Sequence, residues 1–257
     1  MDVAGLADRL DARFPFANAA TWDPVGIQLG WPTSPAGRVA VCHEVTKEIV
    51  ASCREGAIET LVSYHPLLFH PTTSLVAGPT PEGRALQLNR AGVSLIVVHT
   101  ALDAATPGSG DALLDALALP TERIERWAYE DAEGRQAFGR VALLESAVPG
   151  SRIAAMVRDS LESDVRTTST ATEVRRVAVL PGSGGAHVAA AAPLADVLIT
   201  GDVNHHTASQ AKALGLMVID AGHAATERPA IAALYAAVCE EVGDAIHLED
   251  DPTPWEA

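Results

Sequence analysis

Val218-Ile219-Asp220-Ala221-Gly222-His223-Ala224-Ala225-Thr226-Glu227 is the stretch around which this chain is organised. The apolar run at 216–219 predicts a strand that is buried on both faces. Gly222 lets the backbone turn, and apolar residues at helical spacing from Ala224 to Val238 predict a helix. His223 is therefore expected at the start of a helix, directly beyond the end of a strand.

His223 and Glu227 are four residues apart. On a helix this spacing places an imidazole and a carboxylate on one face, about one turn apart. Two interpretations are open at this point: a pair of metal ligands, or a capping interaction at the helix start. Features elsewhere in the chain favour the metal.

The composition favours an α/β protein. Of the 257 residues, 48% are hydrophobic and only 4% aromatic. This length is enough for one large domain or two modest ones that fold without disulfides or metal staples. Because Ala is abundant and aromatic residues are few, we expect cores of Ala, Val and Leu in closely packed helices and strands.

Charge and cysteine content exclude several classes of function. The formal net charge is −15, with 33 acidic and 18 basic residues and no run of Lys or Arg, so no polymeric nucleic acid partner is expected. Cys42, Cys53 and Cys239 have no C-x-x-C spacing, which indicates neither a disulfide framework nor a thiolate zinc site. A reducing cytoplasm fits this pattern. No export signal and no membrane segment or membrane partner are expected.

Strand and helix patterns alternate along both halves of the chain. Expected strands are 39–41, 60–63, 93–98, 138–144, 177–180, 197–199 and 216–219, and expected helices include 46–54, 82–89, 111–117 and 151–161. The charged stretch 121–136 reads as a connector. This alternation predicts two similar α/β lobes, residues 1–125 and 126–257, with mostly parallel or mixed sheets flanked by helices. The C-terminal helix is expected to be able to pack back on the first lobe.

Histidines and carboxylates gather just beyond the predicted strand ends, where parallel α/β sheets bind ligands. Neutral imidazoles and carboxylates suit a divalent cation, which lowers the pKa of a bound water and makes a nucleophile at neutral pH. The pattern therefore predicts a metal-assisted hydrolase. The residues concerned are His65, His99, Asp103, His205, His206, His223 and Glu227.

Five motifs in the right order resemble those of the Nif-three-like family, the GTP cyclohydrolase 1 type 2 homologs. They are Trp22-Asp23-Pro24-Val25-Gly26, Ser63-Tyr64-His65-Pro66-Leu67-Leu68-Phe69, His99-Thr100-Ala101-Leu102-Asp103-Ala104-Ala105, Thr200-Gly201-Asp202-Val203 and the opening stretch from Asp220 to Glu227. The likeness runs from about residue 5 to about residue 240, and an ordered set is far more specific than any single motif.

The resemblance implies a two-lobed Nif-three-like fold that assembles as a toroidal homohexamer around a dinuclear metal centre. The inserted domain that some members carry has no room here. By resemblance, one or two divalent ions per chain (Zn, Fe or Mn) would be held by His65, Asp103, His223 and Glu227. His99 and His206 match positions near the centre, where an imidazole could orient water or carry a proton, and both are candidate catalytic residues. The expected activity is hydrolysis of a nucleotide or related small phosphorylated compound.

One residue departs from the family pattern. Two successive histidines are usual before the proline, and here the first of them is Tyr64. A phenol is a poor ligand for most divalent ions. Three outcomes are open: Tyr64 binds the metal, His43 or His70 substitutes, or only one metal binds tightly. The departure strengthens an alternative function, a non-enzymatic hexameric metal carrier or scaffold.

Two further stretches contain residue types that occur in binding or catalytic sites. Leu180-Pro181-Gly182-Ser183-Gly184-Gly185 follows a strand and opens a helix, so its N–H groups could hold a phosphate, although a tight turn needs the same glycines. No pattern around Ser63 or Cys42 supports nucleophilic serine or cysteine catalysis.

Overall fold

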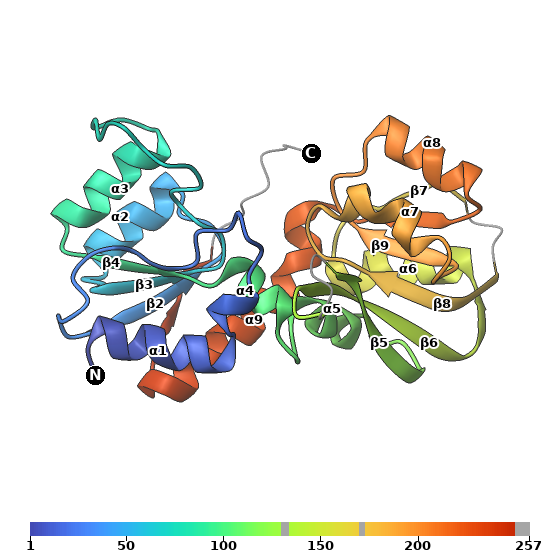
Figure 1. Ribbon diagram of the computed structural model, residues 1–257, viewed down its shortest axis with the longest axis horizontal. Helices are drawn as coiled ribbons and strands as arrows, with labels where there is room; N and C mark the ends of the chain where they lie inside the picture. Colours follow the sequence, from blue (N-terminus) through green and yellow to red (C-terminus); the bar gives the residue numbers. More distant parts are fainter. Residues whose placement is uncertain (130–133, 170–172, 250–257) are drawn as a thin grey trace. The chain divides into compact units, whose positions relative to one another are not determined.

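The computed structural model describes residues 1–129, 134–169 and 173–249. These residues form two compact units, each a sheet with helices on both faces (Figure 1). Unit 1 contains Met1–Ala105 and the chain from Ile231 onward, and unit 2 is Thr106–Ala230. The predicted α/β class is confirmed.

The sheet of unit 1 has the strand order β1-β4-β3-β2-β11. Strands β2, β3 and β4 are parallel, β11 adds to β2 in parallel, and β1 pairs with β4 in the antiparallel direction. The bounds are β1 (Gly26–Leu29), β2 (Val39–Cys42), β3 (Thr60–Ser63), β4 (Ser94–Val97) and β11 (Ile246–His247). Every residue of β2, β3 and β4 is buried, as the continuous apolar runs predict.

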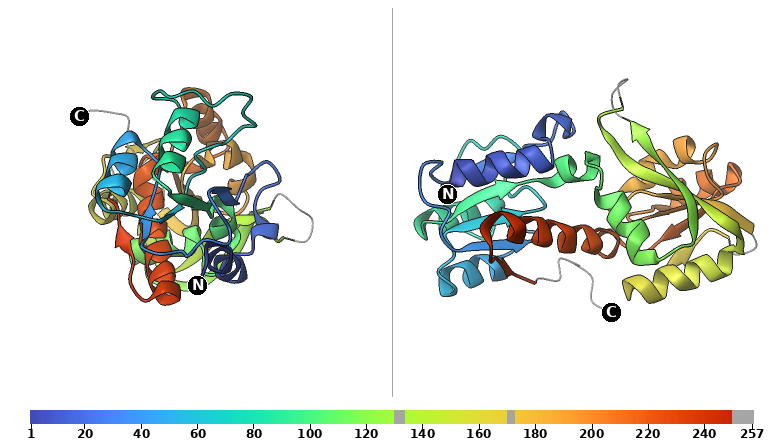
Figure 2. Two further views of the ribbon diagram at one scale, coloured as in Figure 1. Left: turned by 90° about the vertical axis from the view of Figure 1, so that its left-hand side faces the viewer. Right: turned by 90° about the horizontal axis from the view of Figure 1, so that it is seen from below.

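Helices cover both faces of this sheet. Leu61 and Leu95 pack against Ile49 and Leu88 of the two helices on one face, α2 and α3. Helix α1 and the C-terminal part of α9 lie on the other face (Figure 2). The bounds are α1 (Val3–Arg13), η1 (Phe16–Asn18), α2 (Lys47–Glu55), α3 (Pro81–Arg90), α4 (His99–Ala104) and α9 (His223–Val242), which begins in unit 2.

The sheet of unit 2 has the strand order β5-β6-β8-β9-β10-β7. Strands β8, β9 and β10 are parallel, and the antiparallel strand β7 lies outside β10, as β1 lies outside β4 in unit 1. The two units therefore share a core of three parallel strands and one antiparallel edge strand. The bounds are β5 (Thr121–Tyr129), β6 (Ala137–Pro149), β7 (Arg166–Thr167), β8 (Glu173–Val179), β9 (Val197–Thr200) and β10 (Met217–Asp220).

The helices of unit 2 also form two layers. Leu113 of α5 and Ile153 of α6 belong to one core cluster with Val197 and Ile199 of β9. The side chain between them, Leu198, points to the opposite face by strand alternation, and that face carries α7 and α8 (Figure 1). The bounds are α5 (Ser109–Leu117), α6 (Gly150–Leu161), η2 (Gly184–His187), α7 (Val188–Ala191) and α8 (His205–Ala213).

The connector predicted at 121–136 was wrong over its first nine residues, which form strand β5 and pair with β6. Four successive residues from Glu122 to Glu125 are exposed, so the strand shows no alternation of apolar and polar residues. Residues 130–133 lie outside the described residues. The compact units divide the chain after Ala105 and after Ala230, whereas the sequence placed a single boundary at 125/126.

Among the described residues, none of the helices combines the length and the apolar character needed to cross a bilayer.

Candidate functional site

In unit 1, chemistry-bearing side chains gather beyond the carboxyl ends of β2, β3 and β4. We call His43, Tyr64, His65, His99 and Asp103 the Tyr64 cluster. The Tyr64 hydroxyl donates a hydrogen bond to Asp103 Oδ1 over 2.7 Å. The rings of His43 and His65 are stacked with centroids 5.0 Å apart, and the His65 ring lies 4.9 Å from that of His99. His65, His99 and Asp103 thus lie beyond the carboxyl ends of these strands, as the sequence predicts.

His99 is held by an aspartate that the sequence did not single out. Its Nδ1 lies 2.9 Å from Asp23 Oδ2, and the Asp23 side chain is fully buried. Burial opposes ionisation of Asp23, but the hydrogen bond and charge of His99, with two hydrogen bonds from Thr100, outweigh it and lower the pKa of Asp23. The carboxylate therefore fixes the His99 imidazole, so that Nε2 is the nitrogen directed elsewhere.

No local pattern in the sequence links Asp23 to His99, which lies 76 residues later.

In unit 2, the strands β9 and β10 deliver a second group, His223, Glu227 and Asp202, which we call the His223 cluster. His223 begins α9, and its Nε2 lies 3.1 Å from Glu227 Oε1, as the four-residue spacing predicted. Its Nδ1 lies 2.6 Å from Asp202 Oδ2, so Asp202 orients the imidazole. Burial lowers the pKa of His223, but Glu227 first and then Asp202 raise it, to about 9 in total.

Backbone conformation at both clusters departs from the ordinary. His99 has a φ of 23° and Asp202 a φ of 55°, in the left-handed region that side chains rarely adopt. Such positions cost about 1–3 kcal/mol each and are concentrated at functional sites. Each lies just after a parallel strand, where the chain must turn sharply to present its side chain.

Two glycines allow the loops of unit 2 to approach the His223 cluster. A Cβ on Gly182 would lie 2.4 Å from Glu227 Oε1, and a Cβ on Gly201 would lie 2.5 Å from the His223 backbone nitrogen. The Gly182 N–H donates to Thr226 Oγ1 (2.9 Å), and the Gly184 N–H donates to Thr200 Oγ1 (2.8 Å). Close packing thus accounts for Gly182, and the N–H groups of Gly182 and Gly184 are not available to a phosphate.

Asp220 fixes the turn that leads into His223. Its Oδ1 accepts from the Gly222 N–H (3.1 Å), and its Oδ2 accepts from the Val203 N–H (3.2 Å) and pairs with Arg166. Ser163 donates to the Ala221 carbonyl (2.9 Å). Asp220 thereby ties the loop that carries Asp202 to the turn before His223.

The other candidate histidines lie in more open places. His205 and His206 are exposed at the start of α8, with ring centroids 5.5 Å apart. His70 is exposed, and its ring meets that of Phe69 edge-on. The prediction that His65 and Asp103 share a centre with His223 and Glu227 stays a prediction, because the two pairs belong to different units.

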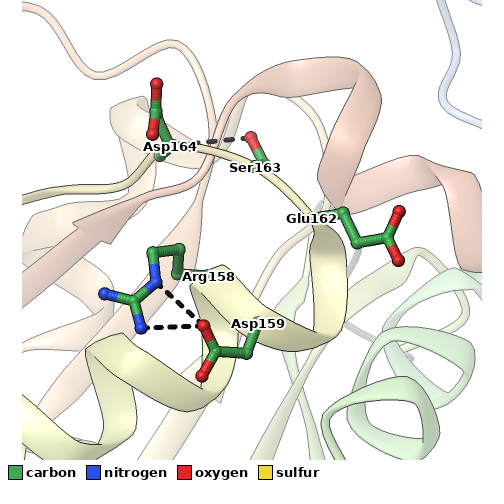
Figure 3. A pocket seen from close by; sticks show the side chains of 5 residues that line it. All are labelled: Arg158, Asp159, Glu162, Ser163 and Asp164. Atoms are coloured by element: carbon green, nitrogen blue, oxygen red, sulfur yellow. Dashed lines mark hydrogen bonds and ion pairs between the residues drawn. The ribbon is translucent and has the colours of Figure 1, made fainter.

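A hollow of about 490 Å³ in unit 2 lies at the end of α6 and is lined by Arg158, Asp159, Glu162, Ser163 and Asp164. Figure 3 shows the Arg158 guanidinium turned toward the Asp159 carboxylate, and the contact between them is 2.7 Å. None of the described residues that line this hollow carries an imidazole. Its guanidinium is already neutralised, so the hollow offers little to an anion.

Comparison with known proteins identifies the family to which the chain is similar. The family model described as Duf34/NIF3 (NGG1p interacting factor 3) matches residues 1–251. A Streptomyces coelicolor protein named GTP cyclohydrolase 1 type 2 homolog is 35% identical, covering 96% of this chain and 91% of that protein. A Lactococcus lactis protein of the same name is 30% identical, covering 80% of this chain and 79% of that protein.

Solved structures share the fold. A Staphylococcus aureus protein matches with a TM-score of 0.86 and 24% identity, covering 100% of this chain and 99% of its own. A Bacillus cereus protein related to NIF3 matches with a TM-score of 0.85 and 19% identity, covering 100% and 99%. The order of motifs, the paired units and the family model agree, and the chain belongs to the Duf34/NIF3 family.

Proposed function

We propose that this protein is a metal-dependent hydrolase of a nucleotide or a related small phosphorylated compound. Ring opening of GTP is the first candidate reaction, because curated relatives bear the name GTP cyclohydrolase 1 type 2 homolog. The observation that carries the proposal is the His223 cluster, in which one imidazole lies between two carboxylates.

The donor chemistry of the chain fits a divalent cation. Imidazole and carboxylate groups gather at the strand ends of each unit, and they suit ions such as Zn, Fe or Mn. The thiols of Cys42 and Cys53 do not compete, since both are buried and burial raises the pKa of Cys53 to about 12. Gly182 leaves open the space beside Glu227 that a Cβ would fill.

We assign His65, Asp103, His223 and Glu227 as the ligands of one or two divalent ions, and Tyr64 is the fifth candidate ligand. A bound cation would supply Lewis acidity, which polarises a substrate oxygen and acidifies a water. Asp202 accepts from His223 Nδ1 and so leaves Nε2 as the nitrogen that binds metal. The assignment of all four ligands to one centre rests on the family resemblance.

His99 is the proposed general base or acid. Asp23 holds its Nδ1, which leaves Nε2 to take up or deliver a proton at the substrate. His206 is the second proposed catalytic residue, four positions after Asp202 and exposed to approaching ligands. Replacing Asp23 with Asn should lower kcat more than the affinity for substrate, because the imidazole loses its orienting charge.

Assembly as a homohexamer is also proposed, on the strength of the resemblance. Measurement of the molar mass in solution tests it: a mass six times that of the 26.8 kDa chain supports the assembly. Neither a membrane nor polymeric nucleic acid is proposed as a partner.

The deciding experiment is turnover of a nucleotide panel by protein loaded with defined Mn, Fe or Zn. We expect His223→Ala and Glu227→Ala to lose metal and activity together. His187→Ala is the matched control, because His187 lies in the same unit and its ring meets that of Trp127 instead. Activity that survives in both cluster variants would refute a reaction that depends on the His223 cluster, and no turnover by the wild type with any of the three metals would refute the hydrolase.

A metal carrier or scaffold is the second candidate, and Tyr64 is the observation that favours it. Its hydroxyl donates a hydrogen bond to Asp103 Oδ1, so this oxygen is less available to a metal ion in unit 1. Stoichiometric, exchangeable metal with no turnover on any nucleotide would support this candidate over the hydrolase.

A further inference from the structure

Two large aromatic side chains of unit 1 are left open to solvent beside the Tyr64 cluster. Trp22 is 53% exposed and Phe69 is 42% exposed. Their ring centroids are 5.6 Å apart and their planes are tilted by 33°. Only 4% of the residues are aromatic, so two exposed rings in contact are unusual for this composition.

Both rings lie beside His99, the proposed acid or base. The Trp22 centroid lies 6.1 Å and the Phe69 centroid 6.4 Å from that of His99. His99 is only 8% exposed. A ligand that lay against Trp22 and Phe69 would therefore lie next to His99, the histidine whose Nδ1 is held by Asp23.

The spacing of the two rings is fixed by the side chain of Gln28. Its Nε2 donates to the carbonyls of Pro24 (2.9 Å) and Leu68 (3.1 Å). Its Oε1 accepts from the Leu67 and Leu68 N–H groups (3.1 and 3.0 Å). Pro24 is two residues from Trp22 and Leu68 precedes Phe69, so one amide holds both ring-bearing loops. A surface that is ordered before binding loses less entropy when a ligand arrives.

We propose that Trp22 and Phe69 bind the planar heteroaromatic ring of the substrate, the base of a nucleotide, next to His99. The identity of this ligand rests on the proposed function. Aromatic side chains recognise bases by stacking, since every base has a π-face, and this contact does not depend on a charged partner. Stacking suits a chain whose net charge is −15 and which would repel a polyanion at long range.

The test is binding of guanosine monophosphate and of ribose 5-phosphate, which lacks the base, to metal-free and Mn-loaded protein by titration calorimetry. We expect Trp22→Leu and Phe69→Leu to weaken guanosine monophosphate binding by about tenfold or more and to leave ribose 5-phosphate unchanged. Gln28→Leu should weaken guanosine monophosphate binding in the same way. Trp31→Leu is the matched control, because Trp31 is 46% exposed in the same unit.

Equal affinity of the wild type for the two ligands, or full nucleotide affinity in Trp22→Leu, would overturn the proposal. A change of oligomeric mass in Trp22→Leu and Phe69→Leu with nucleotide affinity retained would assign the rings to a contact between copies and would also overturn it. The outcome is separable from that of the hydrolase. Trp22-dependent nucleotide binding without turnover supports the ring site and refutes the hydrolase, whereas turnover with unchanged nucleotide affinity in Trp22→Leu does the reverse.

Discussion

Replacing Gly182 with Ala should disrupt the His223 cluster without removing any of its side chains. Gly182 has a φ of 71°, and an added Cβ would lie 2.4 Å from Glu227 Oε1 and 3.4 Å from His223 Nε2. Ordinary contact between a carbon and its neighbour needs roughly 3.5 Å, so the carboxylate must move by about 1 Å. Glu227 is 4% exposed and has little room to do so.

Gly215→Ala separates this clash from backbone strain. Gly215 lies in the same unit with a φ of 74°, and an added Cβ there meets nothing within 4 Å. Left-handed Ala costs about 1–2 kcal/mol, and both variants should lose this amount of unfolding free energy. Gly182→Ala should lose a further 1–3 kcal/mol, roughly, because a buried carboxylate is separated from its hydrogen-bonded imidazole.

Two assays read the two effects. Urea unfolding of metal-free protein gives the stability difference, and competition with a chromophoric chelator gives the metal affinity. We expect Gly182→Ala to bind metal about 10–100-fold more weakly than Gly215→Ala, as when a ligand loses its supporting contacts. Equal metal affinity and equal stability in the two variants would show that Glu227 does not need the space beside Gly182, and the reasoning would fail.

Four further predictions concern charge and metal. The pKa of His223 in the folded protein is about 9, above its ordinary value of 6.5. Its contribution to the stability of metal-free protein should therefore be complete below pH 6.5 and lost as pH rises through about 9. Urea unfolding measured across this pH range tests the prediction. The same proton competes with metal, so chelator competition should find apparent affinity rising up to about tenfold per pH unit and levelling near pH 9. Tyr64→His should raise the metal retained after exhaustive dialysis from one ion per chain to two, measured by elemental analysis; two ions in the wild type would contradict this. Arg140→Met should cost about 3–5 kcal/mol in urea unfolding, because Arg140 is 1% exposed and makes a two-bond ion pair with Asp111 (2.6 and 2.9 Å); a loss below 1 kcal/mol, roughly the value of an exposed pair, would contradict it.

Local patterns were sufficient to predict the parallel core of each unit. Strands such as β3 and β10 are short, wholly buried runs with apolar centres, and the His223–Glu227 contact follows from helical spacing alone. Strand β5 was not predicted from the sequence, because Ile124 is 44% exposed between charged neighbours and the strand is stabilised by pairing with β6. Its ladder, not its own composition, determines its structure.

The orienting aspartates could not be predicted equally well. Asp202 lies directly beyond a predicted strand end, inside one of the motifs that the sequence singles out. Asp23 lies in a turn before β1, and only the tertiary fold brings it to His99. The close packing of Gly182 against Glu227 could not be predicted either, since a glycine needed for close packing and one needed for anion binding are indistinguishable in the sequence.

The two units use one design for their histidines, and this accounts for the importance of Tyr64. In each unit the helix after the third parallel strand begins with a histidine, His99 or His223, and carries an acid four residues later, Asp103 or Glu227. In each, an aspartate holds the histidine Nδ1. The acids differ in what they meet. Glu227 lies 3.1 Å from the Nε2 of its own histidine, whereas Asp103 accepts a hydrogen bond from Tyr64. A histidine at position 64 could offer a metal a nitrogen beside Asp103, and a neutral phenol instead uses the carboxylate as its acceptor. The unequal affinity for two metals that we expect therefore has its cause in unit 1.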